Sequence, residues 1–349
     1  MKPKITSLGY AVPDTSYSQE EIFDGLGYPH QFRRIFLDSG IEKRHFWVPL
    51  PDMMKLSWQK QQERYLAGAI TLSMRASLLC LDGRDTGDIG LLVFCSCTGL
   101  APGPTVGHYL IKPLGLRDDI YITNIGFQGC EGGGFPGLKR AVDFAIATGE
   151  QALVIACELS SCAYYPEPYG KPDPENDYEL LRANAIFADC ASAALVGFDD
   201  NLRHPYVVDS EAHTNTDYLD DLGFKWRNGR LRCLLSKSVP PHAGEVAGKA
   251  IERLLSRNEL KPKDISYWVV HAAGMKVLDI IRDKLGIEEE NLRFSREFLK
   301  AYGNCSSATV GGVAKLLIQS VEPKDGELLA VVTVGPGMTG GMTLLRFGE

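Results

Sequence analysis

The stretch Gly126-Phe-Gln-Gly-Cys130-Glu-Gly-Gly-Gly-Phe135-Pro136 decides how the chain is organised, because it leads from a reactive residue directly into a helix signal. Beyond it, apolar side chains recur on one helical face, at Leu138, Ala141, Val142, Ala145 and Ile146. Pro136 suits a first helical turn, where its missing N–H has no partner to lose. The pattern predicts a glycine-rich turn that holds Cys130 near the N-terminus of a helix.

Two other polar residues stand in the same relation to a helix. Asn304 precedes the apolar stripe Val310, Val313, Ala314 and Leu317, and His271 precedes Val277, Leu278, Ile281 and Leu285. Backbone N–H groups and the positive end of the helix dipole favour a thiolate or an oxyanion at such positions. We therefore predict that the three residues share one chemical purpose, and that the pKa of Cys130 is lowered.

An internal repeat relates the two ends of the chain. Three pairs of segments recur in the same order at an offset of about 175 residues: Asp88–Cys95 with Asp264–His271, Gly129-Cys130 with Gly303-Asn304, and Gly149-Glu150 with Gly326-Glu327. Strands and helices alternate throughout, which favours a layered α/β fold. We predict two similar halves, residues 1–205 carrying Cys130 and residues 206–349 carrying His271 and Asn304.

Composition narrows the classes of function. The 349 residues include 37 Lys and Arg against 44 Asp and Glu, a net charge of −7, so no basic field attracts nucleic acid or an anionic membrane. Neither a signal peptide nor an apolar span of about 18 residues is present, so a cytoplasmic protein is expected. The nine cysteines are odd in number and form no Cys-x-x-Cys pair, which indicates free thiols and no structural zinc.

The residues, taken in order, resemble the type III polyketide synthases (chalcone-synthase-like) of the thiolase superfamily. Six segments carry the resemblance: Cys95-Ser-Cys-Thr98-Gly99, Gly129-Cys130, Ile186-Phe187-Ala188-Asp189, His271-Ala-Ala-Gly274, Tyr302-Gly-Asn304-Cys-Ser-Ser-Ala308 and Gly335-Pro-Gly337. Each is weak alone, and together they make a specific pattern. The resemblance implies a thiolase fold, in which two similar halves form αβαβα layers, and a homodimer.

The same resemblance implies a mechanism. Cys130 would accept an acyl group from coenzyme A (CoA), and His271 and Asn304 would stabilise the enolate left when malonyl-CoA loses carbon dioxide. Repeated extension would end in ring closure to a pyrone, resorcinol or phloroglucinol type of product. CoA thioesters are substrates in this scheme, and no metal, flavin or other cofactor is expected.

Other positions are predicted to bind substrate. Phe187 matches a phenylalanine that gates the cavity in the family, although a core residue is the simpler interpretation. Cys233 stands where the plant enzymes have a second gating phenylalanine, so a wider entrance is expected. Arg34 and Lys43 are candidates for the CoA phosphates, against the alternative of a solvated helix end. Glu131 is the oddest substitution, and we predict that it points away from Cys130.

Two other functions remain open. A single-round enzyme similar to β-ketoacyl synthase III, with CoA or acyl-carrier-protein substrates, would use the same Cys, His and Asn. A non-catalytic partner subunit of the same fold is disfavoured because Cys130, His271 and Asn304 are all present. Product length would separate the first alternative from a polyketide synthase.

Overall fold

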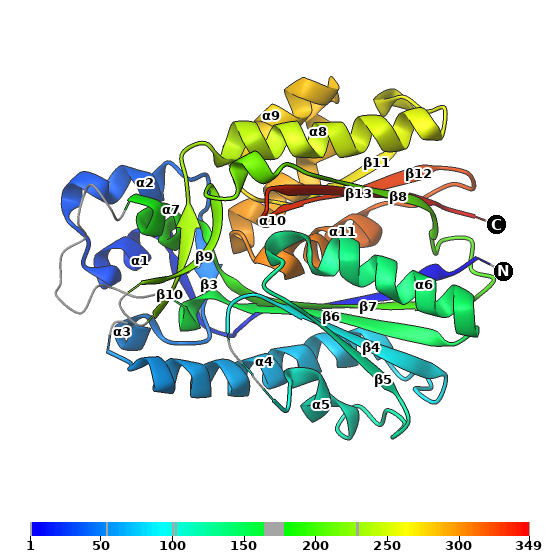
Figure 1. The fold of residues 1–349 in the computed structure, drawn as a ribbon, viewed down its shortest axis with the longest axis horizontal. Helices are drawn as coiled ribbons and strands as arrows, with labels where there is room; N and C mark the ends of the chain where they lie inside the picture. The colour runs from blue at the N-terminus through cyan, green and yellow to red at the C-terminus, as the bar shows by residue number, and fades with distance from the viewer. Residues whose placement is uncertain are drawn as a thin grey trace.

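A computed structural model describes residues 2–53, 55–99, 101, 103–163, 178–227 and 230–348. Nine strands follow one another in the order β11-β12-β13-β8-β1-β7-β6-β4-β5. Only the pair Lys4–Tyr206 joins β1 to β8, and the strands on either side of this pair form two separate layers (Figure 1).

The first layer contains β1 (Lys4–Ala11), β4 (Ile89–Ser96), β5 (Tyr121–Gly126), β6 (Gln151–Leu159) and β7 (Asp189–Gly197). The second contains β8 (Tyr206–Thr214), β11 (Tyr267–Val270), β12 (Leu328–Gly335) and β13 (Thr339–Arg346). β4 pairs in parallel with β5 and β6, and β11 pairs in parallel with β12. β12 is buried along its whole length and is almost entirely apolar, as expected of a strand covered on both faces.

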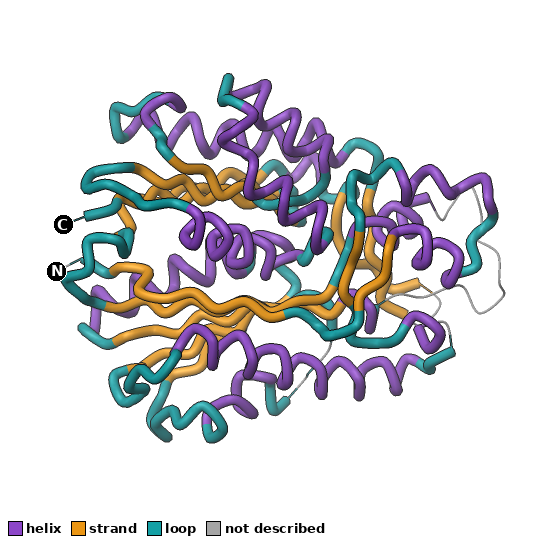
Figure 2. The backbone as a smooth tube through the Cα atoms, turned by 180° about the vertical axis from the view of Figure 1, so that it is seen from behind, coloured by secondary structure: helices purple, strands orange, loops and turns teal. Residues whose placement is uncertain are grey.

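Helices lie outside and between these layers (Figure 1; Figure 2 shows the same arrangement from behind). Between the layers lie α6 (Leu138–Thr148) and α11 (Thr309–Ser320), and α11 contacts strands of both. One outer face carries α4 (Trp58–Leu81) and α5 (Val106–Ile111), and the other carries α8 (Val239–Arg257) and α9 (Met275–Leu285). α10 (Arg293–Tyr302) packs against the central helix α11. The layers are therefore αβαβα, as predicted.

The internal repeat corresponds to real elements. Its first pair of segments forms β4 and β11, its second leads into the two central helices α6 and α11, and its third leads into β6 and β12. The division at residues 205 and 206 falls between β7 and β8, and the organisation of the chain into the two halves 1–205 and 206–349 stays a prediction.

Shorter elements gather at one end of the layers (Figure 1). They are α1 (Gln19–Leu26), α2 (Arg33–Leu37), α3 (Leu50–Met53), α7 (Tyr178–Ile186), the pair β2 (Ser16–Ser18) and β3 (Lys43–His45), and the hairpin β9 (Leu222–Arg227) and β10 (Arg230–Leu235). α7 packs on β10 and α2, so this end closes over the ends of the central strands. Within the described residues, no helix is both long and apolar enough to cross a membrane.

Candidate active site

Cys130 lies in a tight turn between β5 and α6. The turn η2 (Gly129–Glu131) is 3-10 helical, and Cys130 within it is buried. Gly129 has a φ of 72°, and a Cβ there would come within 2.2 Å of Pro336 Cδ, so only glycine allows this approach. The turn thereby packs against the Gly335–Gly337 loop.

A π-helical turn, η3 (Gly133–Gly137), separates Cys130 from α6. Pro136 has no N–H to donate to the carbonyl of Gly132, and the N–H of Gly137 takes that acceptor instead, at 2.8 Å. The prediction that Cys130 precedes a helix is correct, but the α-helix starts later than expected and Pro136 lies before it.

Asn304 is fixed on all sides. Its backbone N–H donates to Ile186 O at 2.9 Å, and its carbonyl accepts from Ala188 N at 2.9 Å, so it pairs with the Phe187 segment. Its side-chain Oδ1 accepts from Ser306 N at 2.8 Å, and Nδ2 donates to Ala273 O at 3.2 Å. This second bond ties Asn304 to the segment that follows His271.

His271 follows β11, and its N–H donates to Val332 O at 2.8 Å. Its side chain is 1% exposed, and neither ring nitrogen has a hydrogen-bond partner within the described part of the chain. Burial lowers the pKa of His271 to about 3, so the imidazole is neutral at pH 7. A neutral ring offers one N–H donor and one acceptor nitrogen.

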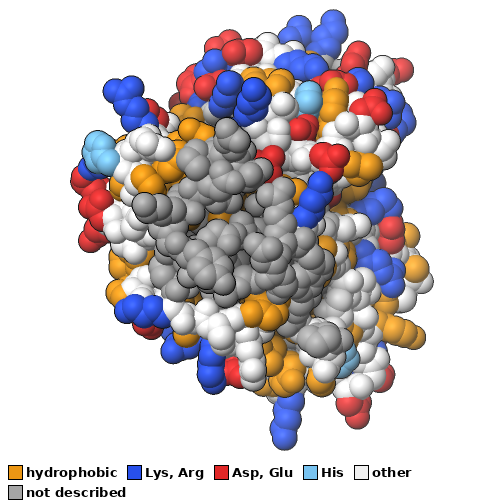
Figure 3. All heavy atoms as spheres, turned by 60° about the vertical axis from the view of Figure 1, so that its left-hand side comes forward, with side chains coloured by type: hydrophobic (Ala, Val, Ile, Leu, Met, Phe, Trp, Pro, Cys, Tyr) orange, Lys and Arg blue, Asp and Glu red, His pale blue; other side chains and the backbone are white. Residues whose placement is uncertain are grey.

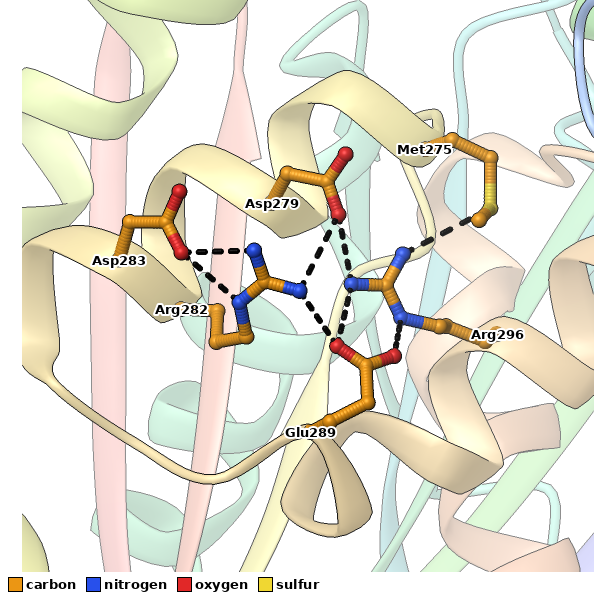
Figure 4. Close-up of polar contacts among 6 residues, drawn as sticks. All are labelled: Met275, Asp279, Arg282, Asp283, Glu289 and Arg296. Carbon is orange, nitrogen blue, oxygen red and sulfur yellow. Dashed lines mark hydrogen bonds and ion pairs between the residues drawn. The ribbon is translucent and has the colours of Figure 1, made fainter.

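An ion-pair network holds the helices that flank these two residues (Figure 4). Arg296 on α10 binds Asp279 on α9 at 2.7 Å and also pairs with Glu289, which lies in the 3-10 turn η7 (Glu289–Leu292). Arg282 on α9 binds the same Glu289 at 2.6 Å. Because α9 starts soon after His271 and α10 ends just before Asn304, the network connects the supports of both residues.

A largely apolar cavity lies in front of Cys130. The hairpin and α7 form one wall, where Phe224 and Cys233 are directly opposed cross-strand neighbours. The lining also includes Cys97, Thr98, Gly129, Cys130, Ser160, Ala163, Leu180, Ala183, Asn184, Phe187, Leu222, Ser306 and Pro336. Cys130, Phe187 and Cys233 are thus brought together, whereas His271 and Asn304 lie behind the lining, with Asn304 linked to it through Ser306.

Comparison with known proteins agrees with this geometry. Residues 32–200 match the family model for the N-terminal domain of chalcone and stilbene synthases, and residues 255–347 match that for the C-terminal part of 3-oxoacyl-(acyl-carrier-protein) synthase III. The chain is 28% identical to 3,5-dihydroxyphenylacetyl-CoA synthase of Streptomyces toyocaensis, over 97% of this chain and 88% of that protein. It is 27% identical to 1,3,6,8-tetrahydroxynaphthalene synthase of Streptomyces coelicolor, over 89% and 81%.

Solved structures show the same fold. The type III polyketide synthase domain of Steely1 from Dictyostelium superposes with a TM-score of 0.88 at 22% identity, over the whole of both chains. The fungal type III polyketide synthase ORAS gives 0.85 at 24% identity, over 99% of this chain and all of that one. The chain is thus similar to the type III polyketide synthases along nearly its whole length. It has the thiolase fold and is a decarboxylative condensing acyltransferase.

The pKa of Cys130 differs from the prediction. Burial raises the pKa of the Cys130 thiol well above its usual range, and the carboxyls of Glu131 and Glu158 raise it further, although a hydrogen bond from Ser306 lowers it. The expected lowering by a helix N-terminus is wrong because the 3-10 and π turns put α6 eight residues after Cys130, and burial dominates.

Glu158, which the sequence analysis missed, is a fully buried carboxyl near the end of β6. It accepts hydrogen bonds from Cys97 N at 3.0 Å, from Thr98 Oγ1 at 2.9 Å and from Ser307 Oγ. Burial raises its pKa. The signal was available, since Glu158 is the one charged residue in the otherwise apolar run Ala152–Leu159. Phe224 was also missed, because nothing in the sequence shows that the hairpin covers the cavity.

The basic candidates stand apart from the cavity. Arg34 on α2 and Lys43 on β3 are both exposed, and neither lines the cavity. Figure 3 shows that Lys and Arg side chains are spread over this end of the molecule among Asp and Glu side chains. Their neighbour Arg44 is fully buried and donates to the carbonyls of Asn184 and Phe187, both at 2.7 Å, so Arg44 supports the Phe187 segment instead.

Glu131 is buried against the Gly335–Gly337 loop. Its Oε2 has no hydrogen-bond partner among the described residues. Glu131 was predicted to point away from Cys130. Its carboxyl lies against Gly335 and does not line the cavity, yet it still raises the pKa of the Cys130 thiol. All nine cysteines are free, and the described residues contain no group of three His, Cys, Asp or Glu that could hold a metal.

Proposed function

We propose that this polyketide synthase loads an acyl starter from CoA onto Cys130, extends it with malonyl-CoA, and cyclises the product. The observation that carries the proposal is that Cys130 opens on a largely apolar cavity, linked through Ser306 to Asn304. An apolar lining of this kind suits an acyl chain that is desolvated while it grows. Relatives named for dihydroxyphenyl and tetrahydroxynaphthalene products support an aromatic product here.

In the loading step, the Cys130 sulfur attacks the thioester carbonyl of the starter. The thiol proton passes to the neutral imidazole of His271, and CoA leaves as a thiolate that takes up this proton. Because burial disfavours both charged forms separately, thiolate and imidazolium have to form together as a pair. The acyl group is then held as a thioester on Cys130.

In the extension step, malonyl-CoA loses carbon dioxide and becomes an enolate. The amide Nδ2 of Asn304 and the N–H of neutral His271 would donate to the enolate oxygen, in the manner of an oxyanion hole. The enolate carbon attacks the acyl-Cys130 carbonyl, and the Cys130 thiolate is released. The chain on CoA is then two carbons longer, and no metal or other cofactor takes part.

Substrates and partners follow the same scheme. We propose that exposed Arg34 and Lys43 bind the phosphates of CoA, where a bidentate Arg and a point-charge Lys suit phosphate.

We also propose a homodimer through β5, the edge strand nearest Cys130 in the chain. Tyr121 at the start of β5 is 64% exposed and Phe127 just beyond its end is 42% exposed, and such an edge is a template for a second copy.

The test of the nucleophile is Cys130→Ala, with Cys80→Ala as a matched control because Cys80 is another buried cysteine, on α4. After incubation with acyl-CoA, intact-mass spectrometry should show one acyl adduct on the wild type and on Cys80→Ala, and none on Cys130→Ala. Slow decarboxylation of malonyl-CoA should persist in Cys130→Ala, since His271 and Asn304 remain. Product formation by Cys130→Ala at the wild-type rate would remove Cys130 from the mechanism.

The starter preference should depend on Cys233. It faces Phe224 across the hairpin, and both line the cavity, so Cys233→Phe would add a ring to a wall that already carries one. We expect the ratio of rates for long and short acyl-CoA starters to fall about tenfold or more, with Cys233→Ser as the control of similar size. An unchanged ratio would mean that Cys233 does not border the starter path.

The alternative of a single condensation, as in β-ketoacyl synthase III, keeps support from the match of residues 255–347. Mass spectrometry of the products separates the two functions. A product with one added two-carbon unit would favour a single condensation, whether CoA or acyl carrier protein carries the substrate. Longer, cyclised products would favour the polyketide synthase.

A further inference from the structure

A buried carboxyl without a cation lies next to the nucleophile. Glu131 is 5% exposed, and no Lys, Arg or His pairs with it within the described part of the chain. Its own backbone N–H donates to the carboxyl, and Oε2 has no partner. A buried polar group in this condition requires an explanation.

Glu131 occupies the space that a side chain at residue 335 would need. A Cβ on Gly335 would lie 1.2 Å from Glu131 Oε2, so Gly335 accommodates the carboxyl. On the other side of Cys130, Gly129 packs in the same way on Pro336, which lines the cavity. The turn and the Gly335–Gly337 loop therefore interlock on both sides of Cys130.

The elements packed around η2 bring no compensating charge. They are η3, β12, β13 and the 3-10 turn η8 (Ser306–Ala308). η3, η8 and β12 contain no ionisable side chain, and β13 contains only Arg346, which pairs with Leu328 at the opposite end of the hairpin from Gly335. Among the described residues, the ionisable groups that interact electrostatically with the Cys130 thiol are Glu131, Glu158, Cys97 and Cys233, and His271, the proposed proton acceptor, is neutral at pH 7.

We propose that Glu131 is a positioning residue of the condensing reaction, which as a neutral acid locks the Cys130 turn against the Gly335–Gly337 loop and on ionising lowers the fraction of Cys130 that is present as thiolate. The proposal rests on the proposed role of Cys130. Burial raises the pKa of Glu131 to about 8, so the acid is neutral at pH 7 and ionises just above it. The carboxylate then raises the pKa of the Cys130 thiol by like-charge repulsion.

The experiment measures alkylation of Cys130 by iodoacetamide in the full chain at a series of pH values, with the Cys130 peptide quantified by mass spectrometry. Glu131→Gln keeps the size of the side chain and cannot ionise, and Glu63→Gln, at an exposed helix position, is the control. We expect the ratio of the Glu131→Gln rate to the wild-type rate to be near one at about pH 6. At about pH 9 it should reach about tenfold, the effect of one unit in the thiol pKa. An equal ratio at both pH values would overturn the proposal, because a purely structural role predicts no change with pH.

The wild type alone provides a second measurement, should Glu131→Gln fail to fold. The alkylation rate of an undisturbed thiol rises about tenfold per pH unit below its pKa. Ionisation of Glu131 should make the rise shallower around pH 8, and an uninterrupted tenfold rise would contradict the proposal. Alkylation does not depend on acyl transfer, so these outcomes are independent of the acyl-loading test on Cys130→Ala.

Discussion

The two flanks of the active site handle charge in opposite ways. On the Cys130 flank, the carboxyls of Glu131 and Glu158 are buried, and their ionised forms are disfavoured by burial. On the flank of His271 and Asn304, the charges lie on α9, η7 and α10, near the surface and in oppositely charged pairs (Figure 4).

Because of this difference, the two flanks of the active site should respond to different solution variables. Desolvation acts on the protonation state of a buried group, so the Cys130 flank should respond to pH. Exposed ion pairs are weakened by dissolved salt, so the other flank should respond to ionic strength. Within the first flank, the two carboxyls also differ, because Glu158 has several hydrogen-bond donors and Glu131 Oε2 has none.

The largest effect is expected from Glu158→Ala. It removes the acceptor of Cys97 N–H and of the hydroxyls of Thr98 and Ser307, and each buried donor left unpaired costs about 1–3 kcal/mol. The free energy of unfolding in urea should therefore fall by about 3 kcal/mol or more. Glu158→Gln, which keeps an acceptor oxygen, should lose less.

Glu131→Ala is the internal comparison for that result. When the Glu131 side chain is removed, no donor from another residue is left unpaired, and only packing and the bond from its own backbone N–H are lost. At about pH 4, where the Glu131 carboxyl is largely neutral in the folded and the unfolded chain, the decrease should be about 1 kcal/mol. Equal losses for Glu131→Ala and Glu158→Ala would show that the hydrogen bonds of Glu158 add nothing to stability.

The second prediction concerns stability against pH. The pKa of Glu131 is about 8 in the folded chain and about 4.3 in an unfolded one, so the folded state binds the extra proton between these values. The contribution of Glu131 to the free energy of unfolding is fully present below about pH 4.3, and it is lost as the pH rises through about 8. Relative to Glu131→Gln, the wild type should therefore lose up to about 1.4 kcal/mol per pH unit in this window.

Melting temperatures of both proteins across this pH range provide the measurement. The difference between them isolates Glu131, because Asp189 and Glu158, whose pKa values burial also raises, are present in both. A constant difference from about pH 5 to about pH 8 would mean that Glu131 ionises in the folded state as it does in water.

The predictions that rested on apolar periodicity and on the internal repeat agree with the structure. The apolar stripes after Cys130, His271 and Asn304 became α6, α9 and α11, because burial of one helix face depends on local spacing alone. The repeat likewise predicted two similar halves, since two similar segments bury similar surfaces, whereas the αβαβα layering was implied by the resemblance. The three candidate catalytic residues then come from the resemblance, and their roles stay predictions.

What the sequence could not provide depends on contacts between distant segments. The raised pKa of Cys130 results from complete burial under the hairpin and the Gly335–Gly337 loop, each about 90 or more residues away in the chain. Arg44 directly follows the exposed Lys43 in the sequence, and only the fold reveals that it is buried against the Phe187 segment. Local spacing predicts which face of an element is buried, and it does not predict what lies opposite.

The smallest effect is expected on the ion-paired flank, from Arg282→Ala. Arg282 contacts Asp283 at 2.7 Å and Glu289 at 2.6 Å, but its side chain is 30% exposed and its partners are more exposed still. Exposed pairs contribute about 0–1 kcal/mol, so the loss in the free energy of unfolding should stay below about 1 kcal/mol and shrink further in about 1 M salt. Arg296→Ala is the matched comparison, because Arg296 shares Glu289 but is only 15% exposed, which should make its loss larger and less sensitive to salt. An equal fall in the free energy of unfolding for Arg282→Ala and Glu158→Ala at every salt concentration would contradict this expectation. The two flanks would then not differ in the way that their burial implies.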